Sequence, residues 1–132
     1  MASWNQKEQE EIEFRVKLVK DFLEKWERYD ELLQQAYLRK QVSQEEEEEF
    51  LRLKAQLARR HQYILEYLGK EYDRPEPITP YLSSTVTLNG LKDIHPEFYK
   101  KLRLQWHSTF LRLNETYGYL VTHHELQVPL EG

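Results

Sequence analysis

The chain has 132 residues, of which 39% are hydrophobic, 13% aromatic and 32% charged, and its net charge is −4. This length suits one domain, and the composition (4 Gly, 5 Pro, no Cys) excludes collagen-like, low-complexity and disulfide-framework proteins. No apolar run approaches the roughly 20 residues that cross a bilayer, and the negative charge argues against a nonspecific polyanion binder. We therefore expect one helical domain over residues 1–124, with no membrane partner.

The first fourteen residues bear on the cellular location. They lack the apolar stretch of a signal peptide, and they are too acidic for a transit peptide. The absence of cysteine fits a reducing compartment. We expect the protein to be cytoplasmic.

The first predicted helix covers residues 4–40. Ser3 and Gln6 form a capping box at its start, because each side chain can bond the backbone N–H of the other residue. Apolar side chains then recur at heptad spacing in three adjacent rows: Ile12, Val19, Trp26 and Leu33; Val16, Leu23 and Tyr37; Phe22, Tyr29 and Ala36. A two-stranded coiled coil uses two rows, so this helix should contact at least two neighbours.

The second predicted helix covers residues 44–70 and begins at a second capping box, Ser43 with Glu46. So short a connection requires an antiparallel hairpin with the first helix. With the turn centred near residue 42, Asp30 lies level with Lys54. The sequence thus predicts a hairpin whose two helices face each other along most of their length.

The third predicted helix covers residues 96–124, because Pro96 suits a first helical position and apolar residues follow at steps of three and four. The tail 125–132 has no pattern and is expected to be disordered. The fold class is therefore an all-α bundle of three long helices. A fourth element would come from the connection 71–95 or from dimerisation.

The connection 71–95 is long for a helical bundle. Its prolines predict an extended stretch from Pro75 to Pro80, and Asn89-Gly90 predicts a tight turn. Extended chain of this length reaches from one end of the bundle to the other. The third helix can therefore run either way, and we favour a crossover that makes it parallel to the second helix.

Two polar residues interrupt the apolar rows. Asp30 is predicted to pair with Lys54 across the hairpin and fix its register; the alternative is a carboxylate that acts as a base or ligand in a cavity. His61 lies in the apolar stripe of the second helix and is predicted to be a core histidine, with a pH-sensitive group as the alternative. Asp30, Lys54 and His61 are thus the buried polar candidates.

Motifs of catalysis and cofactor binding are not found in the sequence. There is no Glu-x-x-His or His-x-x-x-His step for a metal, no Gly-x-Ser-x-Gly elbow and no glycine-rich phosphate loop. His123-His124-Glu125 places its rings about 100° apart on a helix, which does not favour chelation. We therefore assign no catalytic residue, metal or cofactor, and regard an enzyme as the less favoured class.

Surface groups supply the remaining candidates. Tyrosine combines a large contact area with a polar hydroxyl, as protein interfaces do, and four tyrosines gather near the end of the second helix and in the connection: Tyr63, Tyr67, Tyr72 and Tyr81. Basic residues form two small groups: Arg59 and Arg60, and Lys100, Lys101 and Arg103. The basic groups offer phosphate contacts, although a solvated helix face is the simpler interpretation.

Three hypotheses for function follow. The leading one is a noncatalytic helical module for protein–protein interaction or assembly, with a protein partner or self-association. The first alternative is a small-molecule-binding or enzymatic bundle whose pocket lies under the 71–95 connection and uses Asp30, His61 or tyrosines. The second alternative is a nucleic-acid-associated protein that uses the five basic residues.

Overall fold

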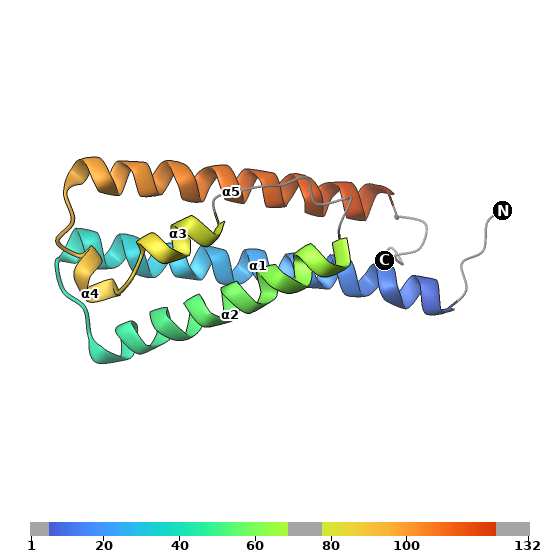
Figure 1. The fold of residues 1–132 in the computed structure, drawn as a ribbon, viewed down its shortest axis with the longest axis horizontal. Helices are drawn as coiled ribbons and strands as arrows, with labels where there is room; N and C mark the ends of the chain where they lie inside the picture. Colours follow the sequence, from blue (N-terminus) through green and yellow to red (C-terminus); the bar gives the residue numbers. More distant parts are fainter. Residues whose placement is uncertain (1–5, 69–77, 124–132) are drawn as a thin grey trace, which may run out of the picture.

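Three long helices pack side by side in the computed structural model, which describes residues 6–68 and 78–123 (Figure 1). They are α1 (Gln6–Arg39), α2 (Gln44–Leu68) and α5 (Pro96–His123). Helix α1 packs against both of the others, as its three apolar rows require. The predicted all-α bundle of three long helices is confirmed.

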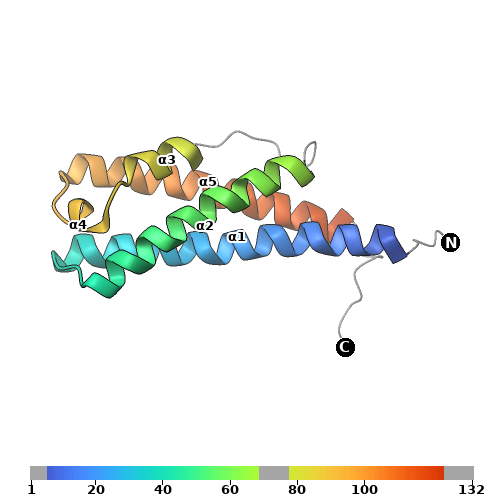
Figure 2. The ribbon, with the colours of Figure 1, turned by 60° about the horizontal axis from the view of Figure 1, so that its bottom comes forward.

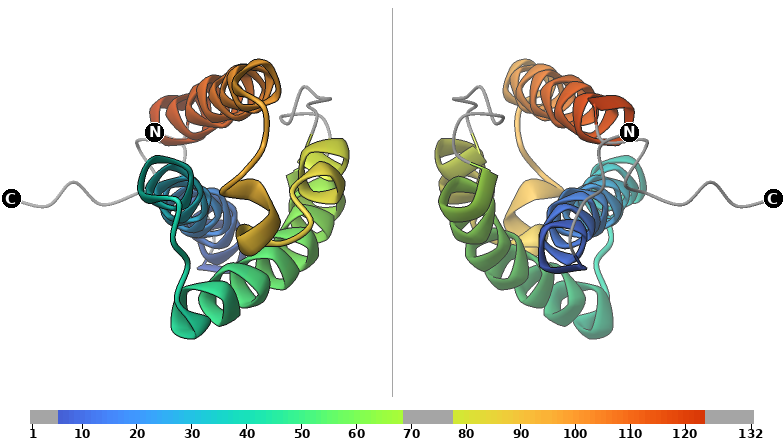
Figure 3. Two further views of the ribbon diagram at one scale, coloured as in Figure 1. Left: turned by 90° about the vertical axis from the view of Figure 1, so that its left-hand side faces the viewer. Right: turned by 90° about the vertical axis from the view of Figure 1, so that its right-hand side faces the viewer.

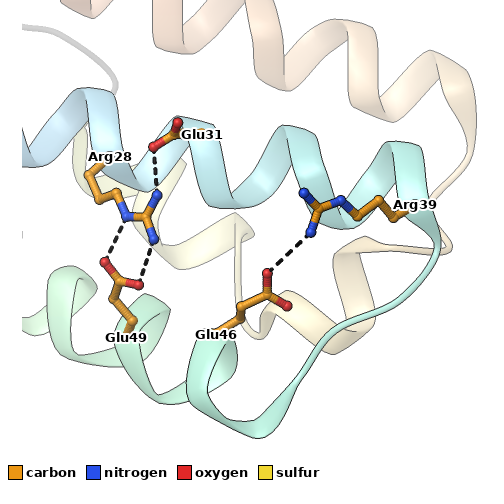
Figure 4. Close-up of polar contacts among 5 residues, drawn as sticks. All are labelled: Arg28, Glu31, Arg39, Glu46 and Glu49. Carbon is orange, nitrogen blue, oxygen red and sulfur yellow. Dashed lines mark hydrogen bonds and ion pairs between the residues drawn. The ribbon is translucent and has the colours of Figure 1, made fainter.

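Helices α1 and α2 form the predicted antiparallel hairpin. The chain leaves α1 at Lys40, which has φ of 60°, and the capping box is present: the backbone N–H of Glu46 donates to Ser43 Oγ at 3.1 Å, and that of Ser43 to Glu46 Oε1 at 2.9 Å. Figure 4 shows the ion pairs that join the helices near this turn. Arg28 binds Glu49 through two N–O contacts of 2.7 and 2.8 Å, and Arg39 lies 3.7 Å from Glu46.

The connection contributes two short helices, α3 (Ile78–Ser84) and α4 (Leu88–Leu91). The prediction of extended chain up to Pro80 is wrong, because α3 buries Ile78 and Leu82 on one face and Pro80 stands in its first turn, where no N–H is needed. Asn89-Gly90, predicted as a tight turn, lies in the single helical turn of α4. Pro75 and Pro77 lie outside the described residues.

A glutamate of α2 holds α4 in place. The carboxylate of Glu47 accepts the backbone N–H groups of Leu88 and Asn89 at 2.9 and 2.7 Å, and Thr87 Oγ1 accepts that of Gly90 at 3.0 Å. These are N–H groups that a helix leaves without an internal partner. Figure 3 shows α3 on the side of the bundle between α2 and α5, and α4 packs against α1 and α2. The connection therefore acts as the partial fourth element.

Helix α5 runs parallel to α2 and antiparallel to α1, so the chain crosses the length of the bundle before α5 begins (Figure 2). The start of α5 lies beside the end of α1, where the rings of Tyr37 and Tyr99 stack at 3.8 Å. The favoured crossover is the one observed.

Stacked aromatic rings fill the core. Trp26 of α1 and Trp106 of α5 lie parallel, 6.2 Å apart, and each indole N–H donates to the other residue's carbonyl, at 3.3 and 3.0 Å. Tyr29 stacks on Phe50 of α2 at 4.3 Å, and its hydroxyl lies 2.6 Å from that of Thr85. These contacts bury two indole N–H groups and a phenol without leaving them unsatisfied.

Candidate functional site

Asp30 lies in the core between α1 and α5, with 6% of its side chain exposed. Its carboxylate is bound by the guanidinium of Arg103 and by the amide of Gln34, the latter at 2.7 Å. The prediction that it pairs with Lys54 is wrong: Asp30 faces α5, whereas the ammonium of Lys54 donates to the carbonyl of Val86, between α3 and α4, at 3.1 Å. The apolar row of α1 that Asp30 interrupts thus marks the contact between α1 and α5 and not the contact between α1 and α2.

Tyr81 of α3 is fully buried beside this ion pair, so its prediction as an interface residue is wrong. The ring packs 5.1 Å from Trp26 and 6.1 Å from Tyr29. Burial, and then the negative charge of Asp30, raise the pKa of its hydroxyl well above the usual value. The hydroxyl has no hydrogen-bond partner within residues 6–68 and 78–123. Tyr81 serves the core, because α3 turns it inward.

His61 of α2 is buried, with 9% of its surface exposed, and its ring lies 6.4 Å from that of Phe22. Burial lowers its pKa, and burial also lowers the pKa of Lys54, which lies seven residues or about two helical turns earlier on α2. Both residues line a groove of about 370 Å³ between α2 and α3, together with Ala58, Gln62, Ile78, Thr79, Leu82 and Ser83. A groove under the connection therefore exists, lined by His61 and not by Asp30.

Tyr63 and Tyr67 are exposed on α2, by 43% and 45%. Tyr67 contacts Phe14 of α1 edge-on, with 5.2 Å between ring centroids, and Phe14 is itself 47% exposed. The three rings form one aromatic patch where α1 and α2 meet. Tyr72 lies outside the described residues, so the patch contains two of the four candidate tyrosines.

The five basic candidates lie on two helices with α3 and α4 between them (Figure 3). Arg60 pairs with Asp21 of α1, and Arg103 with Asp30. Arg59, Lys100 and Lys101 are exposed. Two of the predicted phosphate-binding groups thus join helices within the bundle.

A further feature escaped the sequence prediction: α5 has a second, outward-facing row of residues at steps of three and four. This outer α5 stripe consists of Leu104, His107, Leu111, Asn114 and Gly118, all exposed. Leu104 and Leu111, seven residues apart, are 65% and 51% exposed. Their spacing is visible in the sequence, but the stronger apolar row through Trp106 defines the core face, and the second row was not separated from it.

Beside the outer α5 stripe, an open groove of about 650 Å³ runs along α1. Trp106 of α5 contributes to its wall, and the α1 residues are Glu24, Glu27, Arg28, Asp30, Glu31, Gln34, Gln35 and Leu38. Leu38 is 72% exposed. Acidic groups and one apolar side chain therefore border the outer face that α1 and α5 share.

The described residues show neither a cluster of metal ligands nor a helix suited to a membrane. Within residues 6–68 and 78–123, no three His, Cys, Asp or Glu side chains gather in a way that would hold a metal ion. Among the five described helices, none combines the length and apolar character needed to span a bilayer.

The fold and these surfaces define an all-α helical bundle. No protein family, curated protein or solved structure matches the chain in sequence or structure comparisons. Its function must therefore be argued from its own surfaces.

Proposed function

We propose that the protein is a noncatalytic helical interaction module, which binds another protein through the outer face of α1 and α5. The observation that carries this proposal is the outer α5 stripe, in which Leu104 and Leu111 are 65% and 51% exposed and seven residues apart. A seven-residue repeat of leucine is the pattern by which one helix packs along another. Isolated surface leucines need no explanation, but these two lie on one line of the helix, as residues of a helix-packing row do.

The groups inside the bundle support the same proposal. The carboxylate of Asp30 is occupied by Arg103 and Gln34, and the hydroxyl of Tyr29 by Thr85. These polar side chains serve to fix how the helices pack. The residues that remain for recognition are therefore on the surface.

We also propose that the protein is cytoplasmic. The location of a tagged chain in the cell would test this assignment.

Affinity capture with three matched baits tests the proposal. The baits are the wild type, the Leu104→Arg/Leu111→Arg variant, and a Leu65→Arg control, since Leu65 is 48% exposed on α2 and away from the stripe. Circular dichroism first establishes that all three are equally helical. The wild type and the control should retain the same protein, whether another protein or the chain itself, and the double variant should lose it. Recovery of identical proteins by all three baits would refute the proposal.

A second candidate function is supported by the groove between α2 and α3, whose volume of about 370 Å³ is in the range of small-ligand sites. Leu82 forms part of its apolar wall, and Lys54 and Ser83 offer donors. A small organic acid should then raise the melting temperature of the wild type but not of Leu82→Trp, which fills the groove. Equal shifts in both proteins would exclude this site.

Nucleic-acid binding stays a weaker prediction. Retention of the protein on heparin at low salt would support it.

A further inference from the structure

We infer that the partner of the outer face is a second copy of this chain, related to the first by a two-fold axis that passes between the two α5 helices at Leu111. This inference rests on the proposed function and names the partner of the same surface. In such a pair the α1–α5 layers face each other, α5 runs antiparallel to the partner's α5, and α1 antiparallel to the partner's α1. A two-fold interface must be self-complementary, so every contact must have its mirror counterpart.

The outer α5 stripe meets this requirement. Leu104 and Gly118 lie seven residues before and after Leu111, so an antiparallel pairing about Leu111 sets each Leu104 opposite the partner's Gly118. No atom lies within 4 Å of the position that a Gly118 Cβ would occupy, so the surface is open there. A leucine that enters the space left by a glycine allows two helices to approach closely, and Leu111 then meets the partner's Leu111 on the axis.

The charged residues on the outer face of α1 are also self-complementary about a two-fold axis. Lys17 and Lys20 precede position 22 by five and two residues, and Glu27 and Glu24 follow it by the same intervals. All four side chains are exposed, and none has an ion-pair partner among the described residues. An antiparallel pairing of α1 about position 22 therefore sets each lysine opposite a glutamate of the partner.

The two centres coincide, although they come from different helices. Trp26 lies against Trp106, and because α1 and α5 are antiparallel, four residues back on α1 correspond to four residues forward on α5. Position 22 is thus level with position 110. The pair Asp30–Arg103 gives nearly the same level: position 22 is eight residues before Asp30, and position 111 is eight residues after Arg103. One two-fold axis therefore serves both helices to within about 1.5 Å, the rise of one residue.

Both rows also point to the same side of the layer. At about 100° per residue, His107, Leu111 and Gly118 lie roughly 100–140° around α5 from Trp106. Glu27 and Lys20 lie about 100–120° around α1 from Trp26 in the same sense, and Glu24 and Lys17 lie about 160–180° around, at the edge of this face. Helix α2 binds α1 from the opposite side, through Arg60–Asp21 and Arg28–Glu49, so it leaves this face open.

Other charged groups on this face are compatible with the pairing. Glu13 and Glu31 would be opposite each other, but they lie about 13 Å along α1 from the axis, where crossed helices diverge. Glu31 is bound to Arg28 at 2.6 Å within its own chain. By the same count, the remaining stripe residues His107 and Asn114 would lie opposite the partner's Glu115 and the partner's Ser108, so neither brings like charges together.

Sedimentation velocity of the full chain, from about 1 µM to about 500 µM, tests the inference. The wild type and the Leu65→Arg control should shift from monomer to dimer with concentration. Leu111→Arg should stay monomeric, because it places two arginines on the axis, and its circular dichroism should match the control. A wild type that stays monomeric, or a Leu111→Arg variant that dimerises equally well, would overturn the inference.

A charge exchange distinguishes this geometry from other dimers. Lys17→Glu/Lys20→Glu makes the central part of the α1 face wholly acidic, and Glu24→Lys/Glu27→Lys makes it wholly basic. Each variant alone should dimerise at least about tenfold more weakly than the wild type, and an equimolar mixture should form a heterodimer tighter than either homodimer. No heterodimer in the mixture would overturn the arrangement. If the chain is monomeric but the Leu104→Arg/Leu111→Arg bait still loses another protein, the second copy is refuted while the proposed function stands.

Discussion

The ion pair between Asp30 and Arg103 should stabilise the bundle through a measurable coupling energy. The side chain of Asp30 is 6% exposed and that of Arg103 is 32% exposed, so the loss of stability should differ between a variant that lacks the carboxylate and one that lacks the guanidinium. Arg103→Met leaves a buried carboxylate with the amide of Gln34 as its remaining donor among the described residues, and breaking a fully buried pair in this way costs about 3–5 kcal/mol. Because water reaches one third of the Arg103 side chain, we expect about 2–3 kcal/mol here.

Asp30→Asn should cost less, about 1–2 kcal/mol, because asparagine keeps an acceptor for Gln34 and leaves Arg103 able to reach water. The two single variants and the double variant form a thermodynamic cycle. Hydrogen bonds to charged groups contribute about 1.5–3 kcal/mol, so the coupling energy should fall in that range. Urea unfolding, followed by circular dichroism and tryptophan fluorescence, measures it.

The pair Arg39–Glu46 is the matched control. It also joins two helices, but its side chains are 60% and 28% exposed and lie 3.7 Å apart (Figure 4). Its coupling energy, from Arg39→Met and Glu46→Gln, should be below about 0.5 kcal/mol. If the Asp30 and Arg103 variants are additive within this same limit, the argument that burial strengthens the pair is wrong.

Three further predictions concern single sites. Burial lowers the pKa of His61, so the unfolded chain binds a proton at a higher pH than the folded chain does. The free energy of unfolding should therefore decline as the pH falls below about 6.5, and it should decline less in His61→Gln. Urea unfolding at several pH values measures this difference. At a concentration at which the chain is monomeric, Gly118→Ala should stabilise it by up to about 1 kcal/mol and raise the melting temperature, because no atom of the same chain lies within 4 Å of the added Cβ. Thr85→Val should cost about 1–3 kcal/mol in urea unfolding, because it removes the 2.6 Å hydroxyl partner of the buried Tyr29, whereas Thr85→Ser keeps it.

Each of these predictions has a contrary result. An equal pH dependence in wild type and His61→Gln would show that another group governs the acid limb. A lower melting temperature for Gly118→Ala would mean that the space beside α5 is filled. Equal stabilities of Thr85→Val and Thr85→Ser would remove the Tyr29 hydroxyl bond from the forces that hold α3 against α1.

The helices themselves could be predicted from local patterns. The capping box Ser43–Glu46 and the proline at position 96 act within one helical turn, so the sequence alone places these helix starts. The width of the apolar stripe on α1 likewise indicates two neighbours, because a stripe of three rows is wide enough to pack against two helices. These features depend on residues three to seven positions apart.

Partners across the bundle could not be predicted in the same way. Counting from the hairpin turn matches Asp30 to Lys54, but a count gives the level of a residue along the helix and not the direction in which its side chain faces. The rotation of α1 about its axis turns Asp30 toward α5 and its partner Arg103. Tyr81 was misplaced for a related reason: its burial depends on a short helix, α3, that is stabilised by packing and has little intrinsic stability alone.

The sequence by itself determined that this chain forms three long amphipathic helices with an antiparallel hairpin, because periodicity and capping are local properties of the chain. Only the tertiary structure decided which faces meet, how the connection folds into α3 and α4, and that the outer α5 stripe, with its two leucines, faces outward. The physical reason is that helix rotation and crossing minimise the exposed apolar area of the whole bundle at once, and no single segment contains that information.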